Sequence, residues 1–369
     1  MVDDLREPSF GNSAPFSLGV EEELFLVDPD DGRQVDARER VLSAGLEPAR
    51  GEITGEAHAC EIELITDVCT TVADAAVVLS NLRRAVLGTG IGLIGSATHP
   101  TALEGESEIS DSDRYRYISS QLGAALADPM AALHVHIGMP DAETAIRAFN
   151  GLRRHLPLVE ALAANSPFRH GRDTGFASAR EFSVRAWPRS GAPRAMADYA
   201  DFADFAERLM LAADVPDYTF HWWKLRPHPR LGTVEVRALD VQSSPAHTAA
   251  LVALVHCLAR HEADAPPGPS PAAEILEEAS YRAGREGVAA RLPDADGVPR
   301  PLVDVLAGAL ELARPAAVEL SCAEELEGIH DLLRDGGGAG MQRADRRRGD
   351  MPQVLRGLCE RTAGRSTVT

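Results

Sequence analysis

The chain has few cysteines and no long apolar run. None of its 369 residues belongs to a stretch that approaches the ~20 consecutive apolar residues of a membrane helix. The N-terminus, MVDDLREP, is acidic and lacks the apolar region of a secretory signal. The five cysteines are scattered without a Cys-x-x-Cys pair, which argues against a disulfide framework or a zinc knuckle and favours reduced thiols. We therefore expect a cytoplasmic protein with no membrane partner.

Positive charge is also scarce. The chain has 37 Lys and Arg against 56 Asp and Glu, and its formal net charge is −19. Proteins that bind nucleic acid need a basic surface for the phosphate backbone, so we exclude nucleic acid as a partner. An acidic chain is compatible with binding cations and small molecules. The hydrophobic content of 44% is ordinary for a globular protein.

The common nucleotide and hydrolase motifs are missing. The sequence has no Gly-x-x-x-x-Gly-Lys-Ser/Thr loop and no Gly-x-Ser-x-Gly or His-Glu-x-x-His motif. The glycine-rich run at 88–95 precedes an apolar strand and is weak support for a phosphate loop. If a nucleotide binds, we expect metal ions and arginines to hold it.

Four short apolar stretches, by contrast, each carry two ionisable groups at positions i and i+2. The pairs are Glu21 and Glu23, Glu61 and Glu63, His134 and His136, and Glu235 and Arg237. Successive side chains of a strand point to opposite faces, so the two members of each pair share one face. Charged groups among Val, Ile and Leu are costly to bury without compensation. Four such stretches indicate one polar face that holds metal ions and an anion.

Strands interspersed with helices are the pattern along the chain. We expect strands at about 16–27, ending near 66, at 91–95, at 133–139 and twice within 219–238, and helices at 71–87, 113–126, 141–162 and 247–261. Residues 262–271 form a loop, and 272–369 are mostly helical with a flexible basic segment at 336–348. Alternation along the charged strands favours antiparallel pairing. The prediction is a single α+β catalytic domain over 1–369, with a largely antiparallel sheet in 10–261.

The residue types of the four pairs suit phosphoryl transfer. Carboxylate oxygens are ligands for hard cations such as Mg²⁺ or Mn²⁺, whereas zinc prefers Cys and His. More carboxylates are present than one ion needs: Glu21, Glu23, Glu56, Glu61, Glu63 and Glu235. Two or three ions bridged by phosphate oxygens would use them all, and Arg237 would face the transferring phosphoryl group. Taken singly, a Glu-x-Glu pair usually marks a solvated sheet face, but the recurrence in apolar settings favours a site.

A set of longer motifs occurs in order through about residues 17–247. They are Gly19-Val-Glu-Glu-Glu23, Glu61-Ile-Glu-Leu-Ile-Thr66, Gly95-Ser-Ala-Thr-His-Pro100, His134-Val-His-Ile-Gly138, Ala164-Asn-Ser-Pro-Phe168, Asp173-Thr-Gly-Phe-Ala-Ser-Ala-Arg180, Leu225-Arg-Pro-His-Pro229 and Gly232-Thr-Val-Glu-Val-Arg-Ala-Leu-Asp240. Together they resemble the carboxylate–amine ligase family, also called the type 2 glutamate–cysteine ligases. That family shares the catalytic sheet of glutamine synthetase. The same type of sheet occurs in kinases that phosphorylate guanidino groups. The resemblance implies the same sheet here, with helices packed on one face.

The resemblance also implies an activity and the residues that carry it. The activity is ATP-dependent ligation of a carboxylate, usually the γ-carboxyl of L-glutamate, to an amine such as L-cysteine, with two or three Mg²⁺ or Mn²⁺ ions. By similarity the metal ligands are Glu21, Glu23, Glu56, Glu63, His134 and Glu235. His136 and Arg237 would contact the ATP phosphates, and Arg237, Glu63 and Glu235 would be catalytic. Members of the family commonly pair as homodimers, so the resemblance is compatible with a homodimer and leaves the oligomeric state open.

Two regions concern substrate binding, and neither identifies the substrates. The segment 165–193 is rich in Gly, Pro, Ser and Arg, and we expect a substrate loop in which Arg169, Arg180 and Arg185 bind an α-carboxylate or a phosphate. A typical family member carries Glu-Asn-Arg-Trp-x-Ala-x-Arg-Tyr-Gly where residues 278–287 read EASYRAGREG. This departure weakens any assignment of the acceptor amine.

Other functions remain compatible with the same residues. A kinase acting on a guanidino or amino group would use the same metals, and a non-catalytic homologue would bind the nucleotide without turnover. A metallohydrolase is a weaker alternative. Within the four pairs, Glu61 could orient a neighbour instead of binding metal, and Glu22 should point to the opposite face.

Overall fold

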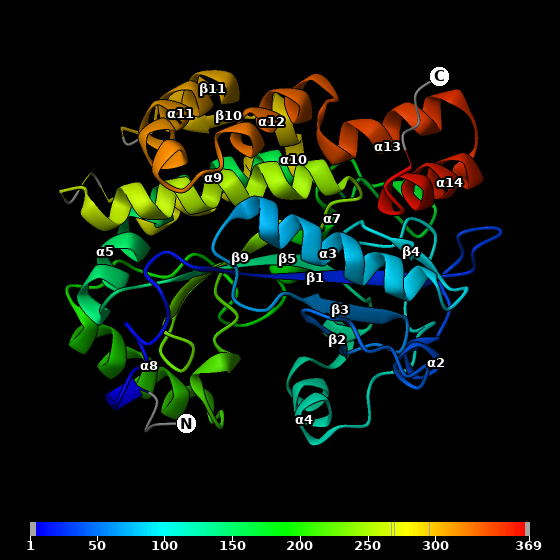
Figure 1. Ribbon diagram of the computed structural model, residues 1–369, viewed down its shortest axis with the longest axis horizontal. Coiled ribbons are helices and arrows are strands. Elements are labelled where there is room, and N and C mark those ends of the chain that lie inside the picture. The colour runs from blue at the N-terminus through cyan, green and yellow to red at the C-terminus, as the bar shows by residue number, and fades with distance from the viewer. Residues whose placement is uncertain (1–4, 267, 269, 295, 366–369) are drawn as a thin grey trace.

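A seven-stranded sheet forms the centre of the molecule (Figure 1). The computed structural model describes residues 5–266, 268, 270–294 and 296–365. The strand order is β2-β3-β1-β5-β9-β8, with β4 paired to β1, and every pairing of these strands is antiparallel. The strands are β1 (Leu18–Val27), β2 (Glu52–Gly55), β3 (Glu61–Ile65), β4 (Gly92–Ile94), β5 (Ala132–Gly138), β8 (Leu225–His228) and β9 (Thr233–Asp240). The predicted largely antiparallel α+β fold is confirmed.

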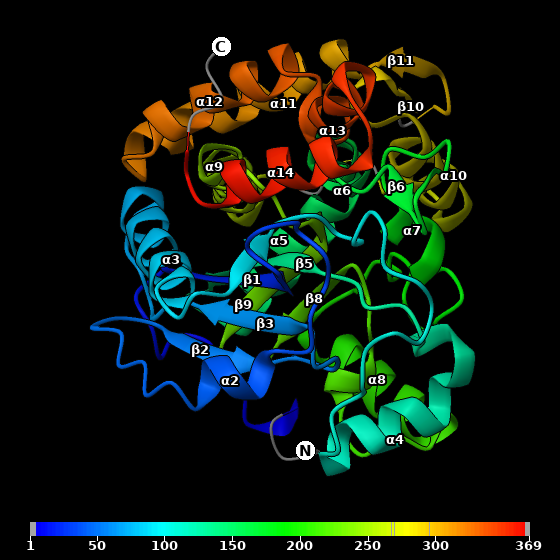
Figure 2. The same cartoon turned by 90° about the vertical axis from the view of Figure 1, so that its right-hand side faces the viewer.

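Helices cover one face of this sheet. The helix α3 (Val72–Leu87) packs on β1, and α9 (Pro245–Asp264) crosses β5 and contacts α3, α5 (Ala142–Leu152), α11 (Leu302–Glu319) and α12 (Ala323–Arg334). Figure 1 shows α3 and α9 on the same side of the sheet, with the C-terminal helices beyond them, and Figure 2 shows the same layering from the side. Since α9 is enclosed between the sheet and the outer helices, it is apolar on nearly all sides.

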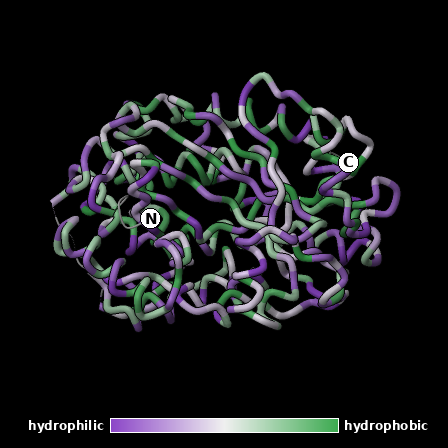
Figure 3. Tube along the Cα trace, turned by 90° about the horizontal axis from the view of Figure 1, so that it is seen from below, coloured by the Kyte–Doolittle hydropathy of each residue, from purple (hydrophilic) through white to green (hydrophobic). Residues whose placement is uncertain are grey.

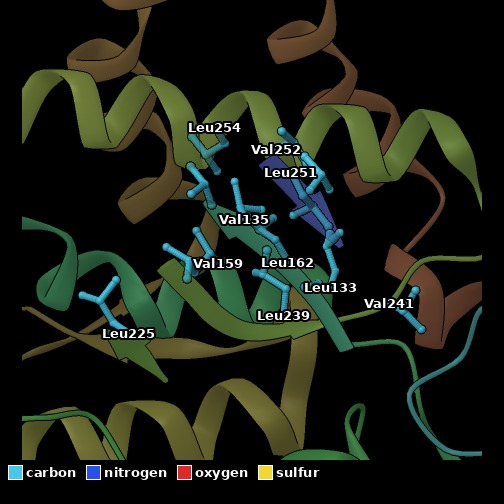
Figure 4. Packing of buried hydrophobic residues seen from close by; sticks show 14 of the residues in the cluster. Leu133, Val135, Val159, Leu162, Leu225, Leu239, Val241, Leu251, Val252 and Leu254 are labelled. Atoms are coloured by element: carbon cyan, nitrogen blue, oxygen red, sulfur yellow. The ribbon is translucent and has the colours of Figure 1, made fainter. Parts of the chain in front are cut away.

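Strand periodicity divides β5 between the two faces of the sheet. Leu133 and Val135 point toward Leu251 and Leu254 of α9 in the buried core (Figure 4). The intervening histidines of β5 therefore point to the opposite face. Viewed from that opposite side, hydrophilic and hydrophobic positions are interleaved along the chain (Figure 3).

Shorter elements surround the second face and the helical layer. On the face away from α9 lie α4 (Asp113–Leu122) and α8 (Tyr199–Ala213) (Figure 1). The remaining elements are α2 (Arg38–Leu42), η1 (Gly123–Leu126), η2 (Arg153–His155), α6 (Leu156–Ala163), β6 (Phe168–Arg169), β7 (Arg172–Asp173), α7 (Ala179–Val184), η3 (Tyr218–Phe220), α10 (Ala273–Glu286), η4 (Gly287–Ala289), β10 (Arg291–Pro293), β11 (Pro299–Pro301), α13 (Gly337–Arg348) and α14 (Met351–Thr362). In the described part of the chain, no helix is both long and apolar enough to cross a membrane.

The prediction of a flexible basic segment at 336–348 is wrong. These residues contain α13, in which Gly338 and Gln342 are buried. The Gln342 side chain donates to the Asn165 carbonyl oxygen over 2.9 Å and to Ser96 Oγ over 3.1 Å. A Cβ atom on Gly338 would overlap the Asn165 side chain, so the glycine is what allows the helix to approach this closely. Tertiary packing thus overrides the low helix propensity of the glycine run.

Several predicted boundaries also shift. The segment 165–193 contains the hairpin β6–β7 and the short helix α7, so it is more regular than expected. The helix predicted at 113–126 ends as α-helix at Leu122, because Gly123 has a φ of +52°. The helix predicted at 247–261 runs from Pro245 to Asp264 and takes up the start of the predicted loop.

Candidate active site

The four predicted pairs meet on the face of the sheet opposite α9. The register places Glu21 opposite His134 and Glu23 opposite Glu63, and His136 opposite Glu235. Because β3, β1, β5 and β9 are neighbours in that order, their polar side chains form one continuous patch. Glu22, between the two glutamates of β1, points to the helical side, where it is buried against Arg83 of α3. Period-two alternation therefore holds through the glutamate triplet, as predicted.

The two histidines bridge the carboxylates of this patch. His134 Nδ1 lies 2.9 Å from Glu21 Oε2, and His136 Nε2 lies 3.2 Å from Glu21 Oε1. Burial alone would raise the pKa of Glu21, but His136 and His134 outweigh it and hold that pKa well below the usual range. Burial and the nearby Arg237 lower the pKa of His134 to about 4. A neutral imidazole with a free nitrogen lone pair is the form that binds metal.

Two arginines hold the carboxylate of Glu235: Arg226 from the neighbouring strand β8 and Arg237 from β9 itself. Arg226 Nη2 lies 2.8 Å from Oε2, and Arg237 Nη1 contacts Oε1. These guanidinium groups hold the pKa of Glu235 well below its usual value in spite of burial. Sequence reasoning missed Arg226. Arg226 and His228 stand at i and i+2 in β8, but Pro227 between them interrupts the strand pattern, so alternation did not mark Arg226 as a site residue.

A second group of carboxylates lacks such compensation. Glu23, Glu56 and Glu63 each offer an oxygen within 4.8 Å of the others. Burial, followed by the charges of Glu56 and Glu61, raises the pKa of Glu23 to about 8. Burial and the charges of Glu56, Glu21 and Glu23 also raise the pKa of Glu63 well above its usual value. Packed carboxylates with raised pKa values are the environment that a divalent cation relieves.

Three groups of side chains have the geometry of a metal site in the described part of the chain. They are Glu21, Glu63 and His134; Glu21, His136 and Glu235; and Glu23, Glu56 and Glu63. Every predicted metal ligand belongs to at least one group, and so does His136. Oxygen donors dominate all three, which fits Mg²⁺ or Mn²⁺.

A cavity of about 220 Å³ is lined by Glu21, Glu23, Glu56, Glu63 and His134 of these groups, whereas His136 and Glu235 are not part of its lining. We call it the active-site cavity. Its lining includes Tyr115, whose hydroxyl donates to Glu56 Oε2 over 3.0 Å, and the half-buried rings of Trp187 and Trp222. His58 also lines it and pairs with Glu61, whose Oε2 lies 3.2 Å from His58 Nδ1. Glu61 thus contacts a neighbouring histidine, as the sequence suggested.

Only one of the three predicted substrate arginines lines the active-site cavity. Arg180 does so, and it donates to the carbonyl oxygen of Arg237 over 3.0 Å. Arg169 is held by Asp128, and Arg185 pairs with Glu181 at 3.1 Å on the far side of α7. This division could not be predicted from the sequence, because it depends on the short helix α7 within the predicted loop.

Comparison with known proteins places the chain in a family. The model described as glutamate–cysteine ligase family 2 matches residues 17–362. A relative from Rubrobacter xylanophilus, provisionally named glutamate–cysteine ligase 2-3, is 40% identical over 97% of this chain and 100% of its own length. A second, from Thermobifida fusca and provisionally named glutamate–cysteine ligase 2, is 33% identical over 92% of this chain and 89% of its own length.

Solved structures share the fold at lower identity. A glutamate–cysteine ligase from Francisella tularensis, solved in complex with AMP, has a TM-score of 0.71 and 13% identity, covering 95% of this chain and 89% of that one. A bifunctional glutathione synthetase from Pasteurella multocida has a TM-score of 0.67 and 14% identity, covering 95% of this chain and 52% of that one. With the family model matched over most of its length, the chain belongs to glutamate–cysteine ligase family 2 and is a carboxylate–amine ligase of that family.

Proposed function

We propose that this protein uses ATP to convert the γ-carboxyl group of L-glutamate to an acyl phosphate, which an amine such as L-cysteine then attacks. Family membership supports the ligase chemistry. The observation that carries the proposal is the set of crowded carboxylates of Glu23, Glu56 and Glu63 beside Arg237 in the active-site cavity. Such a site suits a reaction in which a carboxylate must approach a phosphate, because divalent ions can offset both negative charges.

The three groups of donor side chains would hold the ions. Glu21 and Glu63 share one group, and each also belongs to one further group, so these residues could serve neighbouring ions. His136 was expected to contact phosphate, but it shares a group with Glu21 and Glu235 and could also serve as a ligand. When bound, the metal ions would polarise the γ-phosphate and neutralise its charge.

Arg237 would stabilise the phosphoryl group during transfer. Its guanidinium contacts Glu235 Oε1, while Arg226 holds Oε2 of the same carboxylate at 2.8 Å. Arg237 can therefore turn toward a phosphate without leaving Glu235 unpaired. A guanidinium aimed at the equatorial oxygens strengthens its interaction as charge develops there.

The acyl phosphate also has to be protected from water. The rings of Trp187 and Trp222 line the cavity with their centroids 5.5 Å apart and edge to face. The Trp187 indole N–H donates to the carbonyl oxygen of Ala125 over 2.9 Å, which fixes this wall to η1. An apolar wall above the reacting group excludes water.

The direct test is a screen of amines. The protein is incubated with ATP, Mg²⁺ and L-glutamate, and mass spectrometry follows ADP and any new amide. We expect glutamate-dependent ADP release with at least one amine, and its loss in Glu63→Gln but not in Glu39→Gln, where Glu39 is an exposed residue outside the cavity. No glutamate-dependent ADP release with any amine would refute the ligase proposal. A phosphorylated amine would instead identify a kinase, and binding of ATP without turnover would identify a non-catalytic homologue.

Two further parts of the proposal concern the location and the oligomeric state of the protein. We place the protein in the cytoplasm, where ATP and free amino acids are available, and we expect a homodimer. Gel filtration with light scattering measures the oligomeric state directly.

A further inference from the structure

A second cavity of about 280 Å³ adjoins the active-site cavity. The helix α7 separates the two. Arg180 faces the active-site cavity, whereas Glu181 and Arg185, one helical turn apart, face the second cavity. Val184 and Trp187 line both cavities, so they form the partition between them.

Most cations of the second cavity are already neutralised. Lys224, the only lysine of the sequence, is buried with its Nζ 2.9 Å from Glu160 Oε1 and 2.7 Å from Glu181 Oε2. Arg185 lies 3.1 Å from Glu181 and 3.7 Å from Glu277. The glutamates around the cavity therefore have cationic partners of their own.

Arg189 is the exception. Among the described residues it has no carboxylate partner: its Nε donates to the carbonyl oxygen of Phe220 over 3.2 Å, and its guanidinium lies 5.2 Å from the ring centroid of Trp222. Its Nη2 is buried without a hydrogen-bond partner. A buried cationic nitrogen left in this state is costly, so an anion that reaches it would be bound strongly.

The backbone at this position supports the same conclusion. Arg189 has a φ of +59°, in the left-handed region that a side chain other than glycine rarely adopts. Strain of this kind persists where the surrounding structure fixes it, and it is concentrated at binding sites. The turn holds the guanidinium between the second cavity and Trp222, a residue of the active-site cavity.

We propose that Arg189 binds the α-carboxylate of an amino-acid substrate in the second cavity, with the reacting end of that substrate directed past Val184 and Trp187 to the active-site cavity. The cavity volume suits a molecule the size of an amino acid. The proposal rests on the ligase function proposed above. The α-carboxylate could belong to the donor, L-glutamate, or to the acceptor amino acid, and the two sources are separated by experiment.

The test compares substrates that differ only by the α-carboxylate. The donor pair is L-glutamate and 4-aminobutyrate, and the acceptor pair is L-cysteine and cysteamine. For wild type we expect a preference for the α-carboxylate member of one pair. In Arg189→Met that preference should fall about tenfold or more through KM, the usual scale for losing a hydrogen bond to a charged group, while the KM for ATP stays unchanged. The pair affected identifies the substrate. Unchanged preference in both pairs would overturn the proposal.

Controls separate a binding role from a structural one. Arg189→Lys keeps the charge and should recover part of the preference. Arg208→Met, an exposed arginine of α8, should leave both preferences as in wild type. Circular dichroism shows whether Arg189→Met folds. If it does not, Arg189→Gln is tested in its place, because glutamine keeps a donor for the Phe220 carbonyl oxygen.

Equilibrium binding separates this proposal from the ligase function itself. Calorimetry without ATP measures the affinity of wild type and Arg189→Met for L-glutamate, L-cysteine and their decarboxylated analogues. If wild type forms no amide but Arg189→Met still loses tenfold in affinity for one amino acid, the ligase proposal fails and the Arg189 site stands. If the amide forms but neither affinity nor preference depends on Arg189, the ligase proposal stands and the Arg189 proposal fails.

Discussion

The carboxylate of Glu22 forms a buried, two-pronged ion pair with the guanidinium of Arg83. Glu22 Oε1 lies 2.6 Å from Nη2, and Oε2 lies 2.8 Å from Nε. Thr248 of α9 donates to the same Oε1 over 2.8 Å. One glutamate of β1 thus joins the sheet to α3 and α9, while its two neighbours face the active-site cavity. The same triplet serves structure on one face and the candidate site on the other.

Replacement of Glu22 should make the protein easier to unfold. We expect Glu22→Ala to lower the free energy of unfolding by about 3–5 kcal/mol, because it leaves the Arg83 charge buried without its partner. Urea denaturation followed by circular dichroism measures the loss. The double variant Glu22→Ala/Arg83→Met should be more stable than Glu22→Ala alone. Glu39→Ala, at an exposed salt bridge, should stay within about 0.5 kcal/mol of wild type. Equal losses at Glu22 and Glu39 would contradict this account.

Arg237 should affect the rate more than substrate binding. In Arg237→Met we expect kcat to fall about 10²–10³-fold, the scale on which loss of one transition-state donor acts. The KM for ATP should change much less, because in the proposed site the metal ions would hold the phosphates in the ground state. Steady-state ADP release measures both constants. Arg33→Met removes an exposed arginine and serves as the control. A large rise in KM with unchanged kcat would show that Arg237 binds ATP without stabilising transfer.

The crowded carboxylates should make both stability and metal binding depend on pH. The pKa of Glu23 rises from 4.5 to about 8 on folding. A group with a raised folded pKa contributes stability that is fully present below its unfolded pKa and is lost as pH rises through the folded value. The metal-free protein should therefore become less stable between about pH 4.5 and 8. Glu21 and Glu235 have lowered pKa values, so their contribution is lost only on acidification below that window.

Mg²⁺ should reverse this loss. Binding displaces protons from the carboxylates, so the rise in melting temperature with Mg²⁺ should be larger near pH 8 than near pH 6. Differential scanning fluorimetry at both pH values checks it. Glu63→Gln should weaken the rise at either pH, and Asp30→Asn, a change at an exposed residue, should not. An equal Mg²⁺ effect at the two pH values would argue against a metal site among Glu23, Glu56 and Glu63.

Sequence periodicity predicted the sheet and its polar face because both are local properties of strands. Glu21 and His134 could be placed on one face from alternation alone, and the structure confirms their proximity. Alternation could not find Arg226, since Pro227 interrupts the strand pattern and the partner Glu235 is identified only by the register of β8 and β9. The isolated Arg189 was equally hidden, because its significance lies in the absence of a carboxylate around it among the described residues.

The C-terminal helices were predicted in outline, but α13 was missed for a physical reason. Local propensity disfavours a helix that begins at Gly337 and Gly338, and tertiary contacts, among them those with Asn165 and α14, stabilise it. Asn165 in turn donates to the carbonyl oxygens of Gly95 and Val241, at the ends of β4 and β9. No pattern within residues 336–348 contains this information.

Gly338 is therefore a place where a single methyl group should be harmful. A Cβ atom there would overlap the buried Asn165 side chain, so Gly338→Ala should destabilise the protein by about 1–3 kcal/mol although alanine favours helices. Gly308→Ala is the matched control, because Gly308 lies within α11 with nothing within 4 Å of its added Cβ. That change should stabilise the protein by about 0.5–1 kcal/mol. Chemical denaturation of the two variants decides between close packing and a loosely held segment: stabilisation by both alanines would mean that α13 does not depend on contact with Asn165.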